Sequence, residues 1–474
     1  MNELRSNISQ TNRPQTIRQL RESGYRVLSV KEEMRKNLIA KLREGETLFP
    51  GLIGYEETVI PQVENAILSG QDLILLGERG QAKTRLARSL ISLLDEEVPA
   101  IAGCEINDHP YAPICQACRA RLQECGDDTE IVWIGRDQRY GEKLATPDIT
   151  IADLIGEVDP IKVAEGRYLS DELTIHYGLI PRTNRGIFCI NELPDLVERI
   201  QVGLLNIMEE RDVQIRGYKV RLPLDLYVVA SANPEDYTNR GRIITPLKDR
   251  FGSQVRTHYP RRIEDEISIV ENERTRFADD GVAVVVPSFM REIVAELTHL
   301  ARKSGDISQR SGVSVRVSIS NYENLLSNAQ KRAIRLGEEQ AAPRISDLPA
   351  VIASTTGKIE IEALGEVRED RVVDKLVQGA VLNVWNRYFK TEQFEDLLKR
   401  FAEGYTVEVS EVTGLGRYGK WANELPGMRE AVLKLGAQGN PALTASTVEF
   451  VLEGLHLSRK LNKDRINGRL RYRR

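Results

Sequence analysis

One segment of the chain combines two glycines, a lysine and a threonine in an order suited to binding phosphate. The segment is Gly77-Glu78-Arg79-Gly80-Gln81-Ala82-Lys83-Thr84, and it lies between the apolar run Leu73–Leu76 and a helical pattern. In a loop of the form G-x-x-x-x-G-K-[ST], backbone N–H groups surround the phosphates, the lysine contacts the β- and γ-phosphates, and the hydroxyl coordinates Mg²⁺. Ala82 replaces the second glycine, and we expect it to adopt the helical φ/ψ of a helix start. The pattern predicts binding of ATP with Mg²⁺, whereas the alternative is a chance strand–turn–helix.

Hydrolysis of a bound nucleotide needs a held Mg²⁺, a positioned water and positive charge at the γ-phosphate. Asn191 and Glu192 directly follow the apolar run Gly186–Ile190. Glu192 is the candidate base for the attacking water, and Asn191 is the candidate Mg²⁺ ligand. Asn191 occupies a position where aspartate is usual, and its neutral carbonyl oxygen is a weaker Mg²⁺ ligand than a carboxylate. Taken alone, the same pair is typical of a helix N-cap.

Three later residues complete the candidate catalytic set. Asn233 ends an apolar run that begins at Leu226, where it could hold the attacking water or contact the γ-phosphate. Arg250 follows a short helical pattern, a form typical of an arginine finger that acts on the ATP of a neighbouring subunit. Arg316 begins a helix in the later, mostly helical part, and could close over the phosphates. Each signal is weak alone, but their order along the chain makes them support one another.

Four of the five cysteines lie close together in the sequence. The spacing C-x10-C-x2-C-x6-C joins Cys104, Cys115, Cys118 and Cys125. A C-x2-C pair with two further ligands returned by a loop is typical of structural zinc sites, so the segment predicts Zn²⁺, with His109 as a substitute for one cysteine. Two alternatives are reduced cysteines buried as small apolar side chains and a redox site. The fifth cysteine, Cys189, lies in the strand before Asn191 and should take no part.

The elements that must position these residues are strands alternating with helices, followed by helices alone. Short apolar runs predict strands at 73–76, 131–133, 186–190 and 226–230. One further strand is expected at 254–258. The segment Val213–Val220 alternates around a glycine and predicts a hairpin. From Arg262 onward the pattern is mostly helical. This order predicts an α/β fold with a parallel sheet and a helical domain behind it.

The expected division of the chain has four parts. Residues 1–45 form a polar and helical extension, 46–260 the core, 261–360 a helical lid and 361–474 a helical C-terminal region. Two insertions interrupt the core, a cysteine-rich one at 100–128 and a second at 151–186. The last twenty residues contain eight Lys or Arg side chains and one acid, Asp464. This basic tail is interpreted either as a solvated, frayed terminus or as a docking or phosphate-binding tail.

Composition narrows the class of protein. The chain has 474 residues, 41% of them hydrophobic, and a formal net charge of −4. A slightly acidic chain is not a general nucleic-acid binder. The longest apolar runs are far too short to span a bilayer, and the polar N-terminus lacks the apolar core of a signal peptide. These features predict a cytoplasmic protein.

With these residues in hand, the chain resembles the AAA+ ATPases, specifically the branch of MoxR-type ATPases and the ATPase (I) subunit of magnesium chelatase. The resemblance covers about residues 45–360 and rests on the phosphate loop with its alanine, the segment before Asn191, the hairpin, the strand ending at Asn233, the segment around Arg250, and Arg316. The matching segments are Gly77–Thr84, Tyr177–Gly186, Val213–Val220, Ala230–Glu235, Leu247–Phe251 and Arg316.

The resemblance implies a five-stranded αβα core, a helical lid and a homo-hexameric ring with ATP between subunits. It assigns Asn191 and Glu192 to the Walker B strand, Asn233 to sensor 1, Arg250 to the arginine finger and Arg316 to sensor 2. It also implies an insertion between Ile151 and Gly186 and a partner protein with a von Willebrand A domain. Proteins of this branch remodel such a partner or drive metal insertion.

Three functions fit these features. The first is a remodelling motor or chaperone that hydrolyses ATP. The second is an ATP-dependent assembly scaffold with little turnover, which Asn191 favours. The third is a DNA-acting AAA+ regulator, against which the acidic net charge and the lack of a helix-turn-helix or zinc-finger pattern count.

Overall fold

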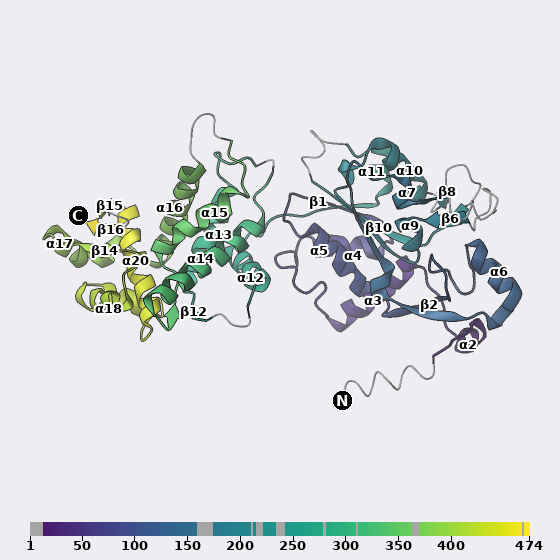
Figure 1. The fold of residues 1–474 in the computed structure, drawn as a ribbon, viewed down its shortest axis with the longest axis horizontal. Coiled ribbons are helices and arrows are strands. Elements are labelled where there is room, and N and C mark those ends of the chain that lie inside the picture. Colours follow the sequence, from purple (N-terminus) through teal and green to yellow (C-terminus); the bar gives the residue numbers. More distant parts are fainter. Residues whose placement is uncertain are drawn as a thin grey trace. The chain divides into compact units, whose positions relative to one another are not determined.

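The computed structural model describes residues 13–158, 174–209, 212–214, 221–233, 242–277, 281–309, 311–362, 369–466 and 469–474. They form two compact units (Figure 1). The first unit contains the chain up to Glu78 together with Ala82–His258, and the second contains Arg79–Gln81 with Tyr259–Arg474. The expected boundaries at residues 45, 260 and 360 stay predictions.

The first unit is built on a five-stranded sheet in which every neighbouring pair of strands is parallel. The strand order is β11-β1-β10-β7-β4. The strands are β1 (Leu73–Leu76), β4 (Tyr140–Leu144), β7 (Gly186–Asn191), β10 (Leu226–Ala232) and β11 (Ser253–Arg256). Every residue of β1, β7 and β10 is buried, as expected for strands covered on both faces. The predicted α/β fold with a parallel five-stranded sheet is confirmed.

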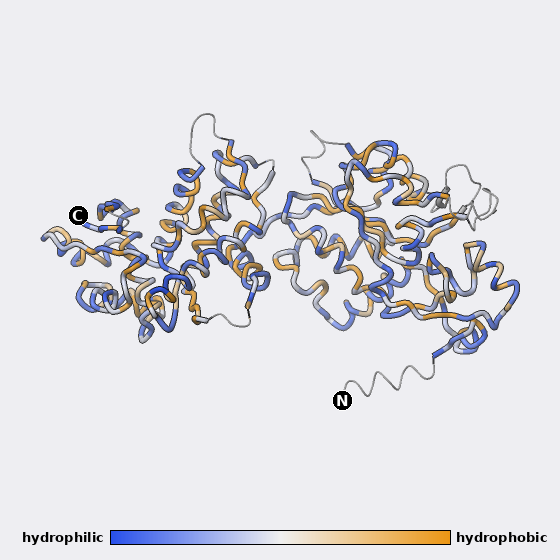
Figure 2. Tube along the Cα trace, viewed as in Figure 1, coloured by the Kyte–Doolittle hydropathy of each residue, from blue (hydrophilic) through white to orange (hydrophobic). Residues whose placement is uncertain are grey.

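Helices cover both faces of this sheet (Figure 1). On one face, Leu73 and Leu75 of β1 pack with side chains of α3 (Val30–Glu44), α4 (Ile60–Leu68) and α5 (Lys83–Ser89). On the other face, Ile74 and Leu76 pack with side chains of α10 (Glu198–Glu209) and α11 (Thr245–Arg250). The alternation follows from the strand, in which successive side chains point to opposite faces. Figure 2 shows the hydrophobic trace of these central strands.

One predicted strand lies outside the central sheet. The sequence predicts that the core resumes with 131–133, but this segment is part of β3 (Ile131–Gly135), which pairs antiparallel with β2 (Glu97–Ile101) in a separate ribbon. The remaining strand of the central sheet is β4, which the sequence does not predict. Because β4 is an edge strand, Gly141 is its one buried residue, and no apolar run marks it.

The remaining elements of the first unit are short. The ribbon β2–β3 carries α6 (Gln116–Cys125), and α2 (Ile17–Glu22) contacts it through Ile17 and Ile131. The other elements are α7 (Ile151–Leu154), α9 (Leu179–Arg182), and the antiparallel pairs β5 (Gly156–Val158) with β6 (Ile175–Tyr177) and β8 (Asp212–Gln214) with β9 (Arg221–Pro223). The strands β8 and β9 are antiparallel, as in a hairpin, but β9 begins after the predicted segment Val213–Val220, most of which lies outside the described residues. The expectations for 1–12, 159–173, 215–220 and 234–241 lie outside the described residues.

The second unit is mostly helical and shares one hydrophobic core, which runs from Val270 to Tyr472. Its long helices are α12 (Ile263–Glu273), α13 (Ser288–Ala301), α14 (Val315–Leu336), α16 (Glu369–Tyr388) and α20 (Pro441–Leu457). Shorter elements are β12 (Ala283–Val284), β13 (Gln340–Ala341), α15 (Val351–Thr356), α17 (Glu395–Ala402), α18 (Leu415–Glu424) and α19 (Met428–Lys434). In the part of the chain that the structure describes, no helix is long and apolar enough to cross a membrane.

The basic tail is folded, so its interpretation as a frayed terminus is wrong. It forms β15 (Asn462–Ile466) and β16 (Arg469–Arg473), and β16 pairs with β14 (Val407–Val409) in a three-stranded antiparallel sheet. Tyr472 is fully buried, and its hydroxyl donates to Glu453 Oε2 at 2.6 Å. Leu470 and Tyr472 alternate with arginines, which is the period-two pattern of a half-buried strand and was hidden by the high charge.

Candidate functional site

The phosphate loop connects β1 to α5. It begins where Gly77 N–H donates to Ala232 O of β10 at 3.1 Å. Gly80 and Ala82 have φ angles of 74° and 53°, so the expectation that Ala82 adopts helical φ/ψ is wrong. A left-handed conformation costs a residue with a side chain roughly 1–2 kcal/mol. Ala82 is the N-cap residue of α5, which begins at Lys83, so the strained conformation belongs to the turn that leads into this helix.

Lys83 is a buried cation at the first position of α5, with 7% of its surface exposed. Its ammonium group donates to Gly77 O, to Glu78 O at 2.9 Å and to Asn233 Oδ1 at 2.6 Å. These bonds turn the side chain back over the loop, which is where the motif requires a positive charge for the β- and γ-phosphates. The placement of this buried ammonium group therefore fits a nucleotide triphosphate.

Thr84 and Asn191 meet beside Lys83. Thr84 Oγ1 lies 3.4 Å from Asn191 Oδ1, which also accepts a hydrogen bond of 3.2 Å from Ser231 Oγ. On the other side of the amide, Asn191 Nδ2 donates to Glu142 Oε1 at 2.7 Å. An ionised carboxylate only accepts hydrogen bonds, so Glu142 fixes the amide with its carbonyl oxygen toward Thr84. Two neutral oxygens thus lie together where the predicted Mg²⁺ site requires ligands.

Glu142 belongs to the candidate site, although the sequence does not single it out. It lies on β4, opposite Cys189 of β7, and both its oxygens accept hydrogen bonds from the Arg88 guanidinium. Burial alone would raise the pKa of Glu142, but the hydrogen bond and charge of Arg88 outweigh burial and lower it. Glu142 is therefore ionised at neutral pH. In the sequence Glu142 stands between Gly141 and Lys143 and belongs to no motif, so only the folded sheet reveals its role.

Glu192 has φ 56°, an uncommon value for a residue with a side chain at the end of a strand. Its carboxylate accepts a hydrogen bond of 2.6 Å from Asn233 Nδ2, and its N–H donates to Ser231 Oγ. Glu192 occupies the N-cap position of the short helix Leu193–Asp195, as the N-cap alternative requires, but its side chain makes no capping hydrogen bond. Strain at such a position is typical of functional sites.

These side chains converge because β1, β10 and β7 are parallel neighbours whose carboxyl ends share one edge of the sheet. Asn233 Oδ1 contacts Lys83 and its Nδ2 contacts Glu192, so the side chain after β10 bridges the groups that follow the other two strands. Ligand sites in open α/β sheets lie at this edge.

The two candidate arginines belong to different units. Arg250 ends α11, and its guanidinium pairs with Glu209 Oε2 at 2.8 Å and with Asp249 Oδ2 at 3.3 Å. Its side chain is 32% exposed. Arg316 is exposed at the start of α14 in the second unit. The roles of both residues stay predictions.

A comparison with models of protein families finds no match. Relatives by sequence include the magnesium-chelatase subunit ChlI of Oryza sativa subsp. indica, 28% identical over 254 residues that make up 50% of this chain and 54% of the relative. Subunit ChlI-2 of Arabidopsis thaliana is 25% identical over 236 residues, or 48% of this chain and 52% of the relative. The resemblance to the AAA+ ATPases of the MoxR and magnesium chelatase I branch is confirmed. The chain spans about half the length of the curated relatives that it matches.

Similar solved structures include one described as modelling of the complex between subunits BchI and BchD of magnesium chelatase. It is 22% identical, covers 70% of this chain and 95% of that chain, and has a TM-score of 0.35. A putative ATPase from Cytophaga hutchinsonii is 15% identical, covers 74% of this chain and 96% of that chain, and has a TM-score of 0.31. Likeness at this level adds nothing to the placement of single residues.

The cysteine-rich segment brings only three of its four cysteines together. Cys104, Cys115 and Cys118 meet beside Asp108, whereas Cys125 is exposed at the last position of α6. The predicted four-cysteine zinc site is therefore wrong in its fourth ligand, because α6 carries Cys125 away from the other three.

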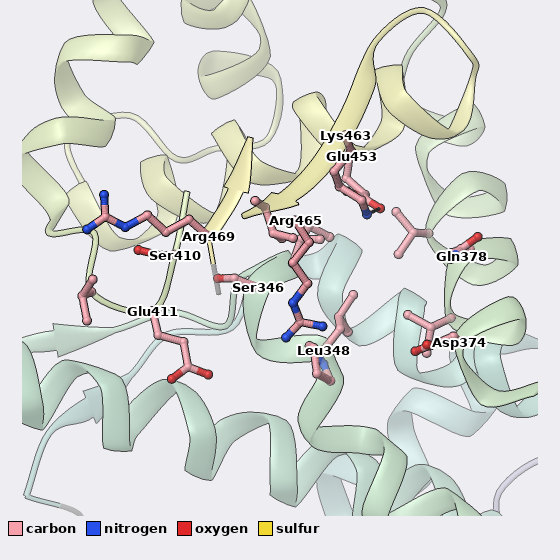
Figure 3. A pocket seen from close by; sticks show the side chains of 16 residues that line it. Ser346, Leu348, Asp374, Gln378, Ser410, Glu411, Glu453, Lys463, Arg465 and Arg469 are labelled. Carbon is pink, nitrogen blue, oxygen red and sulfur yellow. Dashed lines mark hydrogen bonds and ion pairs between the residues drawn. The ribbon is translucent and has the colours of Figure 1, made fainter. Parts of the chain in front are cut away.

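A separate cavity of about 630 Å³ lies in the second unit (Figure 3). Arg465 points into it, while Asp374 and Glu411 line its edge (Figure 3). Lys463, another lining residue, pairs with Glu453 at 2.6 Å. Charges of both signs line the cavity, so it favours no single class of ligand, and we assign it no function.

Proposed function

We propose that the chain is an Mg²⁺-dependent ATPase that works as an AAA+ ring motor and remodels a partner protein. One observation carries the proposal: Lys83, Thr84, Asn191, Glu192 and Asn233, which follow three neighbouring strands, form one hydrogen-bonded group. The relatives described as magnesium-chelatase subunits support the same class of activity. When bound, Mg²⁺-ATP supplies the phosphoanhydride bond whose cleavage drives the motor.

The chain's residues divide the work of binding. The N–H groups of Gly77–Thr84 and the start of α5 face the phosphates, where the helix dipole favours negative charge. Lys83 holds the β- and γ-phosphates. Thr84 and Asn191 hold Mg²⁺ through neutral oxygens, while Glu142 keeps the Asn191 carbonyl oxygen turned toward Thr84. Glu142 adds a negative charge behind the amide, so it compensates in part for the missing aspartate.

Glu192 acts as the base for hydrolysis. Its carboxylate accepts a proton from the attacking water, and Asn233 Nδ2 holds that carboxylate in place. Asn233 also contacts Lys83, so one amide links the phosphate-binding cation to the base. This link gives the site a way to sense whether the γ-phosphate is present.

Assembly and partner complete the proposal. We propose a homo-hexameric ring in which Arg250 reaches the nucleotide of the neighbouring subunit and Arg316 acts as sensor 2. The side chain of Arg250 is 32% exposed, so a neighbouring subunit can reach it, which supports an action in trans. The partner is a protein with a von Willebrand A domain. The motor either remodels this partner or works with it to insert a metal ion. A cytoplasmic location and the absence of nucleic acid from the cycle stay predictions.

Asn191 favours a second candidate function, an ATP-dependent assembly scaffold with little turnover. A neutral amide binds Mg²⁺ more weakly than a carboxylate, so hydrolysis would be slow while nucleotide binding remains intact. The two functions differ in steady-state turnover with and without partner. A rate that stays near the buffer background with partner present would favour the scaffold.

The test of the proposed function uses two substitutions, one that should leave ATP binding intact and one that should weaken it. Glu192→Gln should retain ATP but lose at least about a hundredfold in turnover, because an amide cannot accept the proton. Lys83→Ala should weaken ATP binding at least about a hundredfold, because it removes the charge that holds two phosphates. Calorimetric titration with ATP and phosphate release measure both quantities.

Glu57→Gln is the matched control, since Glu57 is exposed in the same unit. It should behave as the unaltered chain. Full turnover in Glu192→Gln, or unchanged ATP affinity in Lys83→Ala, would reject the assigned site.

A further inference from the structure

The cysteine-rich segment between β2 and β3 gathers four metal-ligand side chains in one place. The sulfur atoms of Cys104, Cys115 and Cys118 and a carboxylate oxygen of Asp108 all lie within 4.8 Å of one another. Asp108 and Cys118 are completely buried, and Cys115 is 4% exposed. These residues come from a loop and from the start of α6, so the fold itself brings them together.

Backbone N–H groups donate hydrogen bonds to two of the three sulfur atoms. Cys104 Sγ accepts from the N–H groups of Ile106 at 3.4 Å and Asp108 at 3.3 Å. Cys115 Sγ accepts from Cys118 N–H at 3.3 Å. Such donors stabilise negative charge on sulfur, which is the form that binds a metal ion.

Asp108 takes the place that the sequence gives to Cys125 or His109. Its two oxygens accept hydrogen bonds of 3.0 Å from the N–H groups of Ile114 and Cys115, which orient the carboxylate beside the sulfur atoms. His109 Nδ1 instead accepts from the N–H groups of Tyr111 and Ala112. A buried carboxylate next to three sulfur atoms, two of them from buried cysteines, is costly unless a cation compensates its charge.

We propose that Cys104, Cys115, Cys118 and Asp108 bind one Zn²⁺ ion in a closed structural site. With Zn–S bonds of about 2.3 Å, tetrahedral ligands lie roughly 3.8 Å apart, which the 4.8 Å limit on this cluster accommodates. Four protein ligands leave no open position, as in structural rather than catalytic zinc sites. Binding displaces the protons of the three thiols, so zinc affinity falls at low pH.

The zinc site braces the segment that leads into the Walker B strand. Asn184 Nδ2 donates to Ile106 O at 3.0 Å, and Asn107 Nδ2 donates to Arg182 O at 3.2 Å. Cys115 and Cys118 also belong to the apolar cluster that contains Phe188 and Ile190 of β7. Metal binding therefore fixes the loop that holds the chain just before Asn191 and Glu192.

The test is the metal content of full-length protein purified without chelator. The unaltered chain and Cys125→Ser should each contain about one equivalent of zinc, because Cys125 lies outside the cluster. Cys118→Ser should contain less than about a tenth of an equivalent, and Asp108→Asn should release zinc to a chromogenic chelator at least about tenfold faster. His109→Ala should retain the metal.

If Cys118→Ser fails to fold, a second measurement tests the site in the unaltered protein. Zinc is removed from the unaltered protein and replaced by Co²⁺, whose absorption reports thiolate ligands in a tetrahedral site. The same bands should appear in Cys125→Ser.

Several results would overturn the proposal. These are less than about a tenth of an equivalent of zinc in the unaltered chain with freely titratable thiols, loss of zinc in Cys125→Ser, or iron with inorganic sulfide in place of zinc. ATP binding is measured in parallel, so failure of the zinc site leaves the phosphate loop assignment standing.

Discussion

At the scale of single residues, Asn191 and Glu142 must be considered together because their side chains are in contact. Asn191 Nδ2 donates to Glu142 Oε1 at 2.7 Å, so an aspartate at position 191 would place two carboxylates in contact. Like charges at this distance raise the pKa of one group and turn the side chains apart. The usual aspartate therefore does not fit this site unless Glu142 also changes.

This contact predicts that Asn191→Asp alone fails to accelerate hydrolysis, whereas Asn191→Asp with Glu142→Gln accelerates it. The paired change restores a carboxylate ligand for Mg²⁺ and an amide that can donate to it. We expect the paired variant to need roughly tenfold less Mg²⁺ for half-maximal turnover. The measurement is the ATPase rate as a function of Mg²⁺ concentration, with Glu142→Gln as the control. Equal acceleration in the single and paired variants would show that Glu142 does not restrain Asn191.

At the scale of elements, the strands that the sequence predicts are those buried on both faces. The runs 73–76, 186–190 and 226–230 are apolar throughout, and each lies in the interior of the sheet. The edge strand β4 escapes prediction because its side chains are polar, and Glu142 escapes with it. Asn191, Glu192 and Asn233 could be predicted because they lie at or just after the end of an apolar run, and Lys83 and Thr84 because they belong to the phosphate-loop motif. Asp108 could not, since one acid among seventy acquires meaning only when the loop folds.

A buried ion pair joins an N-terminal helix to the start of the edge strand. Arg139, directly before β4, donates through Nη1 and Nη2 to the two oxygens of Glu33 in α3 at 2.8 and 2.6 Å, and through Nε to Arg185 O. Arg139 is 1% exposed and Glu33 is 3% exposed. The pair connects α3 to the strand that carries Glu142, so it supports the site as well as the fold.

Removal of one partner should cost far more than removal of both. We expect Arg139→Met to lower the free energy of unfolding by about 3–5 kcal/mol, because Glu33 would keep an uncompensated buried charge. Glu33→Gln with Arg139→Met should recover part of this loss. Chemical denaturation of the single and double variants measures the coupling. The exposed pair of Lys399 and Asp396 is the control, and its coupling should be far smaller, because exposed ion pairs contribute little to stability.

At the scale of the whole molecule, the residues expected as a lid and as a C-terminal region share one hydrophobic core. Phe289 of α13 stacks on Phe450 of α20, with ring centroids 4.2 Å apart. Tyr418 and Tyr472 join this core from α18 and β16. The sequence does not reveal this sharing, because helical periodicity shows that a face is apolar but not which helix covers it. The segments 261–360 and 361–474 therefore contribute to one core and fold together.

Ring assembly is the remaining property at this scale, and the candidate arginine finger provides its test. Arg250→Ala and Glu192→Gln should each abolish turnover in a pure ring. In a ring mixed at equal amounts, an Arg250→Ala subunit retains Glu192 and receives Arg250 from a Glu192→Gln neighbour at about a quarter of interfaces, if assembly is random and the finger acts in trans. We therefore expect about a quarter of the unaltered rate, measured as phosphate release across a series of mixing ratios.

The control for this experiment is Arg199→Ala, since Arg199 is exposed on α10 in the same unit. It should retain full activity, alone and in mixtures. Native mass spectrometry establishes that mixed rings form. Mixed rings without activity at any ratio would mean that Arg250 acts within its own subunit or only supports α11 through its pair with Glu209. Activity near a quarter would place each nucleotide between two subunits, because only a neighbour can then supply the missing guanidinium.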